Sequence, residues 1–221
     1  KNRYPNVRIL TWKKEFNYSA INNFAVREAR GEYLLFLNND VEIITENWLE
    51  EMLQLCQQKD VGMVGAKLYY PDDTIQHAGV VVGLGGVAAH VLCKLPRDAE
   101  GYMGRLRCVQ EISAVTAACM MVKTSVFKAV GGFDEELKVA FNDIDLCMKV
   151  RKYGVKIVFT PYAELYHYES KSRGLEDTPE KVARFNKEIA TFEKKWPEIL
   201  KNGDPYYNPN LTLKSQDFSL K

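Results

Sequence analysis

The sequence lacks the features that mark membrane-spanning, disulfide-bonded and nucleic-acid-binding proteins. No apolar run approaches the roughly 20 residues that cross a bilayer, and we expect no secretory leader. The net charge of +1 gives no support for a nucleic-acid partner. The cysteines are odd in number and form no C-x-x-C pair: Cys56, Cys93, Cys108, Cys119 and Cys147. They predict buried thiols in a reducing compartment, so we expect a cytoplasmic protein.

The composition predicts one globular domain. The chain has 221 residues, of which 46% are hydrophobic and 27% charged, enough to bury a core of ordinary size. We expect this domain to cover residues 1–200. Residues 201–221 are rich in Pro, Asn and Tyr and are expected to form an extended tail on the surface.

The first part of the chain predicts a strand, a helix and a strand, the unit that builds parallel sheets. Val7–Leu10 is a short strand candidate. Ser19 is a candidate cap for a helix from about Ala20 to Arg30, which Gly31 would end. Tyr33–Leu37 follows and consists of apolar residues, as in a strand buried on both faces.

The rest of the chain continues to alternate between helix and strand patterns. The predicted elements are a helix 46–58 after Thr45, a strand 62–68, an exposed loop 97–107, a strand region 109–122, a helix 125–130, a helix 144–153, a strand 155–160 and a helix that begins at Thr178-Pro179. The order favours an α/β fold with a mostly parallel mixed sheet flanked by helices.

The strand 33–37 ends on Asn38, Asn39 and Asp40, which makes this point a candidate ligand site. Ligands of open α/β sheets bind just past the carboxyl ends of the strands. Oxygen-bearing side chains there can hold a hard cation and, through it, a diphosphate. The alternative is that Asp40 only caps the next element.

Two further groups carry candidate chemistry. Asp143 and Asp145 lie two positions apart, so on a regular helix their side chains point about 200° apart. Asp143 can aim out of the helix end while Asp145 faces elsewhere; alternatively, both stabilise the helix N-terminus by about 0.3–1 kcal/mol each. His167 lies between Tyr166 and Tyr168 and is either a metal ligand or a packed core residue.

Taken together, these motifs resemble a known family. The matching segments are 16–24 (FNYSAINNF), 29–40 (ARGEYLLFLNND), 75–79 (IQHAG), 130–135 (VGGFDE), 141–147 (FNDIDLC) and His167. In order and approximate spacing they resemble the family-2 glycosyltransferases of the GT-A fold, from about Val7 to His167. The segment 204–211 (DPYYNPNL) is similar to the end of such domains in bacterial enzymes that build cell-surface polysaccharide.

The resemblance implies a metal site and a catalytic base. Asp40 matches the direct metal ligand of the family's D-x-D motif, and His167 matches a further ligand, which implies Mn²⁺ or Mg²⁺ as cofactor. Asp143 matches the general base. Two positions depart from the family pattern, because Asn38 replaces the first Asp of the motif and Asn142 replaces a Glu beside the base.

The resemblance also implies the classes of donor and acceptor substrate. The donor would be a UDP- or dTDP-linked sugar and the acceptor a saccharide or lipid-linked saccharide, with reaction at the inner face of the plasma membrane. Donor contacts are expected from Asn38, Asn39, Asn23, Arg30, Lys171 and Arg173, the last two in a lid or, alternatively, a solvated loop. Acceptor contacts are expected from Gly132, Asp134 and Asp145, although residues 131–134 are equally typical of an ordinary turn.

The implied reaction is a single displacement with inversion at the anomeric carbon. Family members begin with a base-binding strand and loop that we do not find ahead of residue 7. We therefore expect an N-terminally truncated domain with weak or no transferase activity alone. A bare sheet edge would then favour a homo-oligomer.

Two other functions remain open at this point. A non-catalytic GT-A-like binding or interaction module fits the departures at Asn38 and Asn142. A nucleotidyltransferase also has acidic clusters at strand ends, but it needs a glycine-rich, basic N-terminal loop that the sequence does not show.

Overall fold

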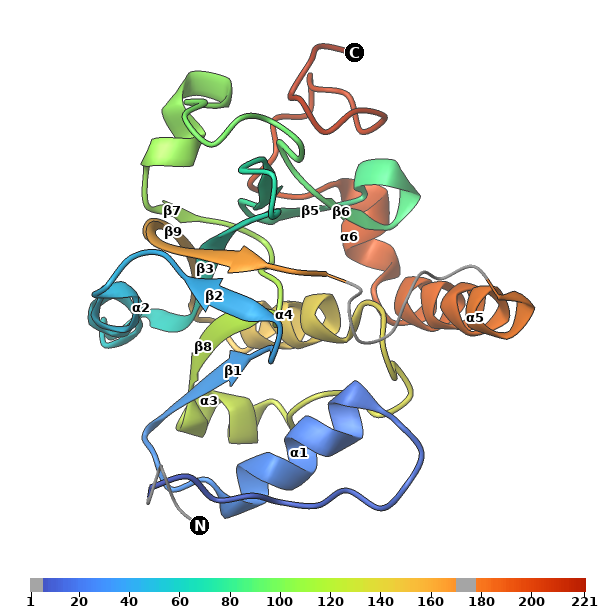
Figure 1. Ribbon diagram of the computed structural model, residues 1–221. Helices are drawn as coiled ribbons and strands as arrows, with labels where there is room; N and C mark the ends of the chain where they lie inside the picture. Colours follow the sequence, from blue (N-terminus) through green and yellow to red (C-terminus); the bar gives the residue numbers. More distant parts are fainter. Residues whose placement is uncertain (1–5, 170–177) are drawn as a thin grey trace.

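The structure is a computed structural model that describes residues 6–169 and 178–221. Its centre is a mixed sheet with helices on both faces (Figure 1). The strand order is β1 (Tyr33–Leu37), β8 (Cys119–Lys123), β3 (Val61–Tyr69), β9 (Lys156–His167) and β2 (Val41–Ile43). Two short strands lie off this path: β4 (Ile75–His77) pairs with β3, and β7 (Gln110–Glu111) pairs with β9.

The predicted α/β class with a mixed sheet flanked by helices is confirmed, but the expectation of mostly parallel pairing is wrong. β3 and β9 pair in parallel, whereas the β1–β8, β3–β8, β2–β9, β3–β4 and β7–β9 pairs are antiparallel. The cause is β8, which arrives late in the chain and lies between β1 and β3, so β1 has no parallel neighbour among the described strands.

The helices cover the sheet as the hydrophobic pattern requires. α2 (Trp48–Cys56) packs Trp48, Met52 and Cys56 onto one face, against Val64 and Leu165 among others. The opposite face is covered by the group of α1 (Tyr18–Glu28), α3 (Thr124–Ala129) and α4 (Asn142–Lys152). Because both faces are covered, every residue of β3 is buried, which explains its continuous apolar run.

The remaining elements lie around this centre. They are a two-stranded sheet of β5 (Val80–Val82) and β6 (Ala88–His90), the 3₁₀ helices η1 (Leu84–Gly86) and η2 (Tyr102–Arg107), and the helices α5 (Pro179–Lys195) and α6 (Pro197–Asn202). Within the described ranges, no helix is both long enough and apolar enough to cross a membrane.

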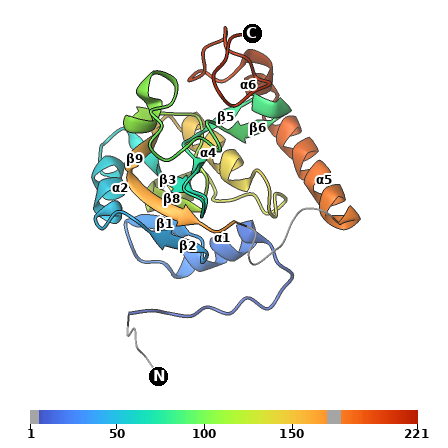
Figure 2. The same ribbon diagram turned by 45° about the horizontal axis from the view of Figure 1, so that its top comes forward.

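The N-terminal part differs from the prediction. Residues 7–10 form no strand, and Val7 and Ile9 are 63% and 88% exposed. Figure 2 shows this segment running outside the sheet toward α1. The helix is capped by Asn17 rather than Ser19, because the Asn17 Oδ1 accepts a hydrogen bond from the backbone N–H of Ala20 at 3.0 Å.

The C-terminal tail is not simply extended on the surface. Asp204, Tyr207, Leu211 and Phe218 are buried. Asp204 fixes the start of the tail, since its carboxylate accepts hydrogen bonds from the Val82 N–H at 2.8 Å and from the Ser113 hydroxyl at 2.6 Å. Residues 204–221 therefore contribute to the core of this domain.

The cysteines are free thiols, and the prediction that they are buried holds for three of them. Cys56, Cys119 and Cys147 are buried, Cys93 is half-buried and Cys108 is exposed. Burial raises the pKa of Cys56 to about 11 and that of Cys119 to about 12. The buried thiols therefore act as small hydrophobic side chains.

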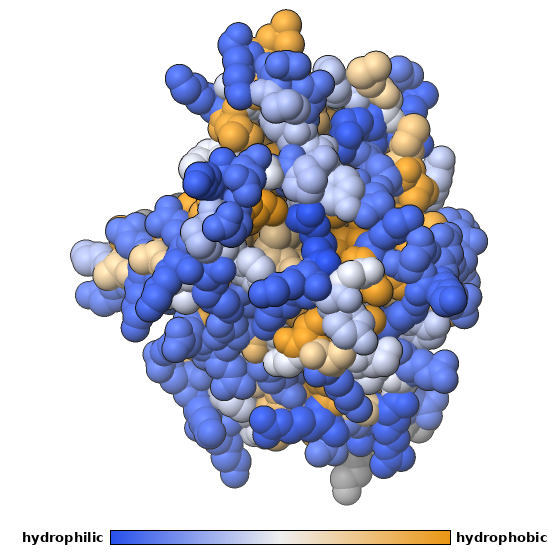
Figure 3. All heavy atoms as spheres, turned by 180° about the vertical axis from the view of Figure 1, so that it is seen from behind, coloured by the Kyte–Doolittle hydropathy of each residue, from blue (hydrophilic) through white to orange (hydrophobic). Residues whose placement is uncertain are grey.

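The face opposite the one in Figure 1 is mainly hydrophilic, with hydrophobic side chains in separate groups (Figure 3). This pattern is typical of a solvated surface.

The tight packing around Gly65 generates a stability prediction. A Cβ atom at this position in β3 would lie 2.4 Å from Cγ1 of Val115. We expect Gly65→Ala to lower the free energy of unfolding by about 1–3 kcal/mol, measured by urea denaturation. Val115 Cβ would lie 2.5 Å away as well, so the control is the double variant Gly65→Ala/Val115→Gly, which removes the whole clashing side chain. If Gly65→Ala costs as much in the Val115→Gly background as in the wild type, the packing argument is wrong.

Candidate functional site

The candidate site lies at one rim of the sheet. β1, β3 and β9 run in one direction, and β8 and β2 in the other. The segments that follow β1, end β9 and precede β8 therefore meet at the same rim, to the right of the sheet in Figure 1. These segments are 38–40, 167–169 and 116–118. The rim is the place where open α/β sheets bind ligands.

The pairing of β2 with β9 brings Asp40 and His167 together. Val41 is the register partner of His167, and the backbone N–H of Tyr168 donates to the Asp40 carbonyl at 2.8 Å. Asp40 Oδ1 lies 3.3 Å from His167 Nε2, and Asn38 Nδ2 lies 3.2 Å from the same nitrogen. Asp40 Oδ1 is buried and has no hydrogen-bond partner within the described part of the chain.

Gln76 fixes the orientation and tautomer of His167. The Gln76 amide nitrogen donates to the His167 carbonyl at 3.1 Å and faces Glu169 Oε2 at 3.4 Å, so its oxygen must face His167 Nδ1, at 2.7 Å. An amide oxygen only accepts hydrogen bonds, so Nδ1 carries a proton. In a neutral ring, Nε2 then presents its lone pair to the buried oxygen of Asp40.

This arrangement fits a divalent cation. A lone pair facing a carboxylate oxygen is favourable only if a proton or a cation lies between them, and metal-bound histidines usually donate their second ring N–H to an oxygen. The described residues contain no group of three or more His, Cys, Asp or Glu side chains that could hold a metal ion. Asp40, His167 and the amide of Asn38 could thus supply only part of a coordination shell. Mg²⁺ typically takes its remaining ligands from phosphates and water.

Asp143 approaches the same rim from α4. Its Oδ2 accepts a hydrogen bond from the Ala117 N–H at 3.2 Å, and its Oδ1 accepts from the Ile144 N–H at 2.9 Å. The neighbouring Ala118 carbonyl accepts from the Asn38 N–H at 3.0 Å. Asp143 and Asn38 are therefore attached to adjacent residues of one segment, which brings the candidate base close to the candidate metal site.

α5 holds the loop that leads to Asp143. Glu188 is 2% exposed, and its two carboxylate oxygens accept hydrogen bonds from the N–H groups of Val139 and Ala140 at 2.9 and 3.0 Å. Phe141 then takes a left-handed conformation with φ of 59°, and α4 begins at Asn142. Asn142 is one of the two residues that differ from the family pattern. It forms a structural contact, because its buried amide donates a hydrogen bond to the Val139 carbonyl.

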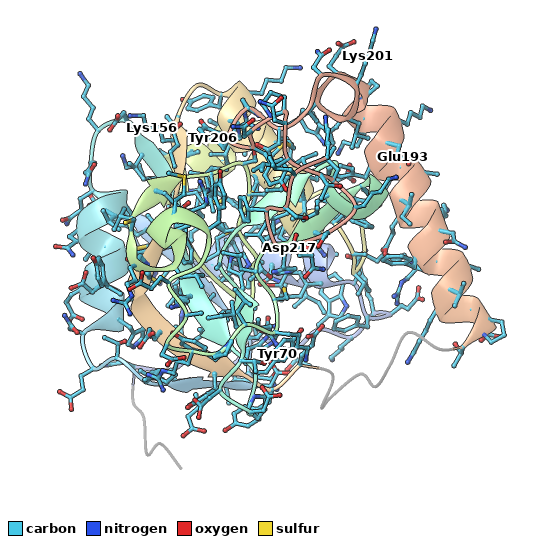
Figure 4. All side chains as sticks on the ribbon, turned by 90° about the horizontal axis from the view of Figure 1, so that it is seen from above. Tyr70, Lys156, Glu193, Lys201, Tyr206 and Asp217 are labelled. Atoms are coloured by element: carbon cyan, nitrogen blue, oxygen red, sulfur yellow. The ribbon has the colours of Figure 1, made fainter. Side chains whose placement is uncertain are left out.

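A small cavity of about 120 Å³ opens beside His167 and Gln76. Its lining consists of polar and aromatic residues, namely Tyr70, Gln76, His90, Cys93, Thr116, His167 and Glu169. In the view from above, Tyr70 lies at the rim beside β2 and the end of β9 (Figure 4). His90 is paired with His77 behind it, with 2.8 Å between the two Nδ1 atoms. Burial lowers the pKa of both rings, while Asp143 and Glu169 act in the opposite direction on His90.

Several residues predicted to bind substrate lie elsewhere. Arg30 precedes β1 and lines an open hollow at the opposite rim with Lys123 and Lys128. At about 3.3 Å per residue, the five residues of β1 separate it from Asn38 by about 17 Å. Asn39 is exposed in the turn after β1. The predicted donor contacts Lys171 and Arg173 lie outside the described residues.

Asn23 and Gly132 form a structural contact with each other. The Asn23 amide donates to the Phe133 carbonyl at 2.9 Å and accepts from the Phe133 N–H at 3.0 Å. Gly132 has φ of 68°, and a Cβ there would lie 2.7 Å from Asn23 Oδ1. These contacts hold the 131–135 loop against α1 and α3. They do not reach the Asp40–His167 pair.

Asp145 belongs to a buried ion-pair network. It is fully buried, and its carboxylate lies 2.6 Å from Lys195 Nζ, 3.3 Å from Lys149 Nζ and 2.9 Å from the Trp196 indole nitrogen. Lys195 also pairs with Asp134. The predicted acceptor residues Asp134 and Asp145 are thus the partners through which α4 and the 131–135 loop hold the end of α5.

Three residues that the structure brings into or behind the site have no role that the sequence predicts: Gln76, His90 and Glu188. Gln76 lies in the IQHAG motif, which carries only the resemblance to the family. A Gln in the middle of a three-residue strand is no signal by itself. The contacts of Gln76 and Glu188 depend on distant partners, because His167 lies 91 positions from Gln76 and Val139 lies 49 positions from Glu188.

Comparison with known proteins identifies relatives over nearly the whole chain. Residues 5–188 match the glycosyltransferase-like family. The chain is 56% identical over 215 residues to the uncharacterized protein y4gI of Sinorhizobium fredii, with 97% of this chain and 24% of the relative covered. It is 41% identical over 218 residues to the O-antigen biosynthesis protein RfbC of Myxococcus xanthus, with 98% and 17% covered. The chain thus spans about a quarter or less of the length of these two relatives.

Solved structures share the fold. The crystal structure of GalNAc-T7 with UDP, GalNAc and Mn²⁺ has a TM-score of 0.63 at 13% identity, over 86% of this chain and 36% of that chain. The mannosyltransferase PcManGT of Pyrobaculum calidifontis, in complex with GDP-Man and Mn²⁺, has a TM-score of 0.53 at 15% identity, over 82% and 45%. At these identities the similarity shows the GT-A fold alone.

The network around Asp145 predicts that this residue acts on stability. We expect Asp145→Asn to lower the free energy of unfolding by about 3–5 kcal/mol, because Lys149 and Lys195 lose the buried charge that compensates them. Asp134→Asn removes the other, partly exposed partner of Lys195, and we expect it to cost less than about 1 kcal/mol. Urea denaturation of the two variants measures the difference. If Asp145→Asn is as stable as the wild type, the structural role of Asp145 is wrong, and Asp145 is again a candidate contact to the acceptor.

Proposed function

Because the chain belongs to the glycosyltransferase-like family, we propose that it forms the catalytic part of a metal-dependent, inverting glycosyltransferase. In this proposal the enzyme moves a sugar from a nucleotide-sugar donor to a hydroxyl group of a saccharide acceptor, in the synthesis of a cell-surface polysaccharide. The O-antigen biosynthesis relative supports the pathway class. The UDP and GDP-Man in the solved structures support a nucleotide-sugar donor.

One observation carries the proposal. His167 Nε2 lies 3.3 Å from the buried Oδ1 of Asp40, which has no hydrogen-bond partner among the described residues, at the rim that Asp143 reaches from α4. Asp40 and His167 would hold a divalent cation, which neutralises the charge of the departing nucleoside diphosphate when it is bound. The Mn²⁺ in both solved structures supports this assignment.

Asp143 acts as the general base. The acceptor hydroxyl oxygen forms a bond to the anomeric carbon as the bond from that carbon to the diphosphate oxygen breaks. The electron pair of the broken bond leaves with the nucleoside diphosphate, and the hydroxyl proton goes to Asp143. Hydrogen bonds from the Ala117 and Ile144 N–H groups fix the orientation of the carboxylate for this transfer.

A non-catalytic GT-A-like module is the second candidate. Asn38 and Asn142 favour it, since both replace charged residues of the family pattern. The amide of Asn142 is engaged in its hydrogen bond to Val139. Asn38 is therefore the difference from the family pattern that affects the proposed metal site.

The first functional prediction concerns Asp143. We expect Asp143→Asn to lower kcat for sugar transfer by about 10²–10⁴-fold, because the amide cannot accept the acceptor proton. Binding of the nucleoside diphosphate with Mn²⁺ should stay within twofold of the wild type. Transfer assays on a panel of UDP-, GDP- and dTDP-sugars, with calorimetry for binding, measure both. Asp60→Asn, at the far end of the sheet, is the control. If Asp143→Asn has the same kcat for sugar transfer as the wild type, Asp143 is not the general base.

The second functional prediction concerns Gln76. Gln76→Leu leaves His167 Nδ1 without its acceptor, and we expect the affinity for Mn²⁺ in the presence of a nucleoside diphosphate to fall roughly 10–100-fold. Gln76→Glu keeps an oxygen at this place and should retain the affinity. Electron paramagnetic resonance of free Mn²⁺ measures the binding. The absence of Mn²⁺ binding by the wild type, with Asp40→Ala behaving the same way, would favour the non-catalytic module.

Self-association also stays a prediction. β1 is an edge strand of the described sheet, and an open edge is a template for pairing with a second copy. Light scattering coupled to size exclusion tests it.

A further inference from the structure

We propose that His90 binds a hydroxyl group of the transferred sugar, through its Nε2–H, and that His77 sets the tautomer that makes this possible. The proposal rests on the proposed function and names a specificity-determining contact within the same site. It is carried by the geometry of the histidine pair and of the small cavity in front of it.

The protons of the pair can be assigned from its contacts. The Nδ1 atoms of His77 and His90 lie 2.8 Å apart, so one of them carries a proton and the other accepts it. His77 is fully buried, and its Nε2 has no hydrogen-bond partner in the described part of the chain. Orphaned N–H groups are rare in protein interiors. The proton of His77 is therefore on Nδ1, where it is donated to His90.

His90 then has only one place for its own proton. Its Nδ1 accepts from His77, so a neutral His90 carries its proton on Nε2, on the side of the ring away from His77. His90 lines the cavity, and none of the described residues forms a hydrogen bond with His90 Nε2. The pair thus presents one fixed, uncharged N–H donor to the cavity.

The cavity suits a hydroxyl-bearing ligand better than a phosphate. Its volume of about 120 Å³ leaves room for several water molecules or for part of a sugar. The lining includes the Thr116 hydroxyl and the Gln76 amide, and the Glu169 and Asp143 carboxylates act on His90. Nearby carboxylates repel an anion, whereas a hydroxyl group can donate to them and accept from His90.

The position of the cavity indicates that its ligand is the sugar that is transferred. One wall is His167, on the side where the diphosphate would be held, and the segment 116–118 on the other side carries the contact to Asp143. In a single displacement the base and the leaving diphosphate lie on opposite sides of the anomeric carbon. The sugar ring between them therefore adjoins His90.

The experiment compares binding with and without the sugar. Calorimetry in the presence of Mn²⁺ measures the affinities for UDP, GDP and dTDP and for UDP-glucose, UDP-galactose, UDP-GlcNAc, GDP-mannose and dTDP-rhamnose. For the nucleotide-sugar that the wild type binds, we expect His90→Ala to weaken binding about tenfold. Its affinity for the matching diphosphate should stay within twofold. His90→Gln can donate from its amide and should restore part of the loss.

A second measurement tests the role of His77 directly. Nitrogen-15 NMR of the imidazole rings should show His90 as the Nε2–H tautomer in the wild type. His77→Phe keeps a ring in the core but removes the donor, so His90 should become a mixture of tautomers and bind the nucleotide-sugar more weakly. Circular dichroism confirms that each variant is folded.

The outcomes separate this inference from the proposed function. Loss of nucleotide-sugar affinity with retained diphosphate affinity supports the contact to the sugar. Equal affinities of His90→Ala and the wild type, equal loss of both ligands, or an Nδ1–H tautomer of His90 overturns the inference and leaves the proposed function standing. A wild-type protein that binds none of the nucleotides with Mn²⁺ overturns both.

Discussion

The arrangement of the site depends on the pairing of β9 with its two neighbours. The parallel ladder between β3 and β9 runs from Val61 and Lys156 to Tyr69 and Tyr166, and the end of β9 then also pairs with the short strand β2. This second pairing places Val41 opposite His167 and so fixes Asp40 beside the imidazole. A shift of one residue in this ladder would turn His167 to the other face of the sheet and separate it from both Asp40 and Gln76.

The base side of the site is held by a different set of contacts. α5 lies at the edge of the fold (Figure 1), where Glu188 binds the backbone of residues 139–140, and Lys195 and Trp196 bind Asp145 in the first turn of α4. Both ends of the segment that carries Asp143 are thus attached to one helix. Buried charged groups are costly unless they are paired, so this attachment is specific as well as strong. Such fixed positions suit the proposed single displacement, which needs the base and the cation held in place on either side of the sugar.

In the buried histidines of the candidate site, neighbouring groups determine which ring nitrogen carries the proton. His77 determines where the ring proton of His90 lies, and Gln76 places a proton on Nδ1 of His167. The result is a defined donor on His90 and a defined lone pair on His167, on opposite sides of one small cavity. In water both rings would sample two tautomers, and neither the proposed cation nor the proposed sugar would meet a fixed group.

The sequence by itself determined the α/β class and the strands 33–37 and 62–68, and it indicated Asp40, Asp143 and His167 as candidates. The class and the strands follow from periodicity and from the residues at strand and helix ends, which act over a few positions, whereas the roles of the three candidates came from the family resemblance. Only the tertiary structure decided the place of β8 between β1 and β3, the separation of Arg30 from Asn38, and the structural roles of Asn23, Asp134 and Asp145. Each of these depends on partners far apart in the chain: Asn23 meets Phe133, and Asp145 meets Lys195. Long-range pairing is set by the packing of whole elements, so residue type and spacing do not reveal which polar residues face a ligand and which face each other.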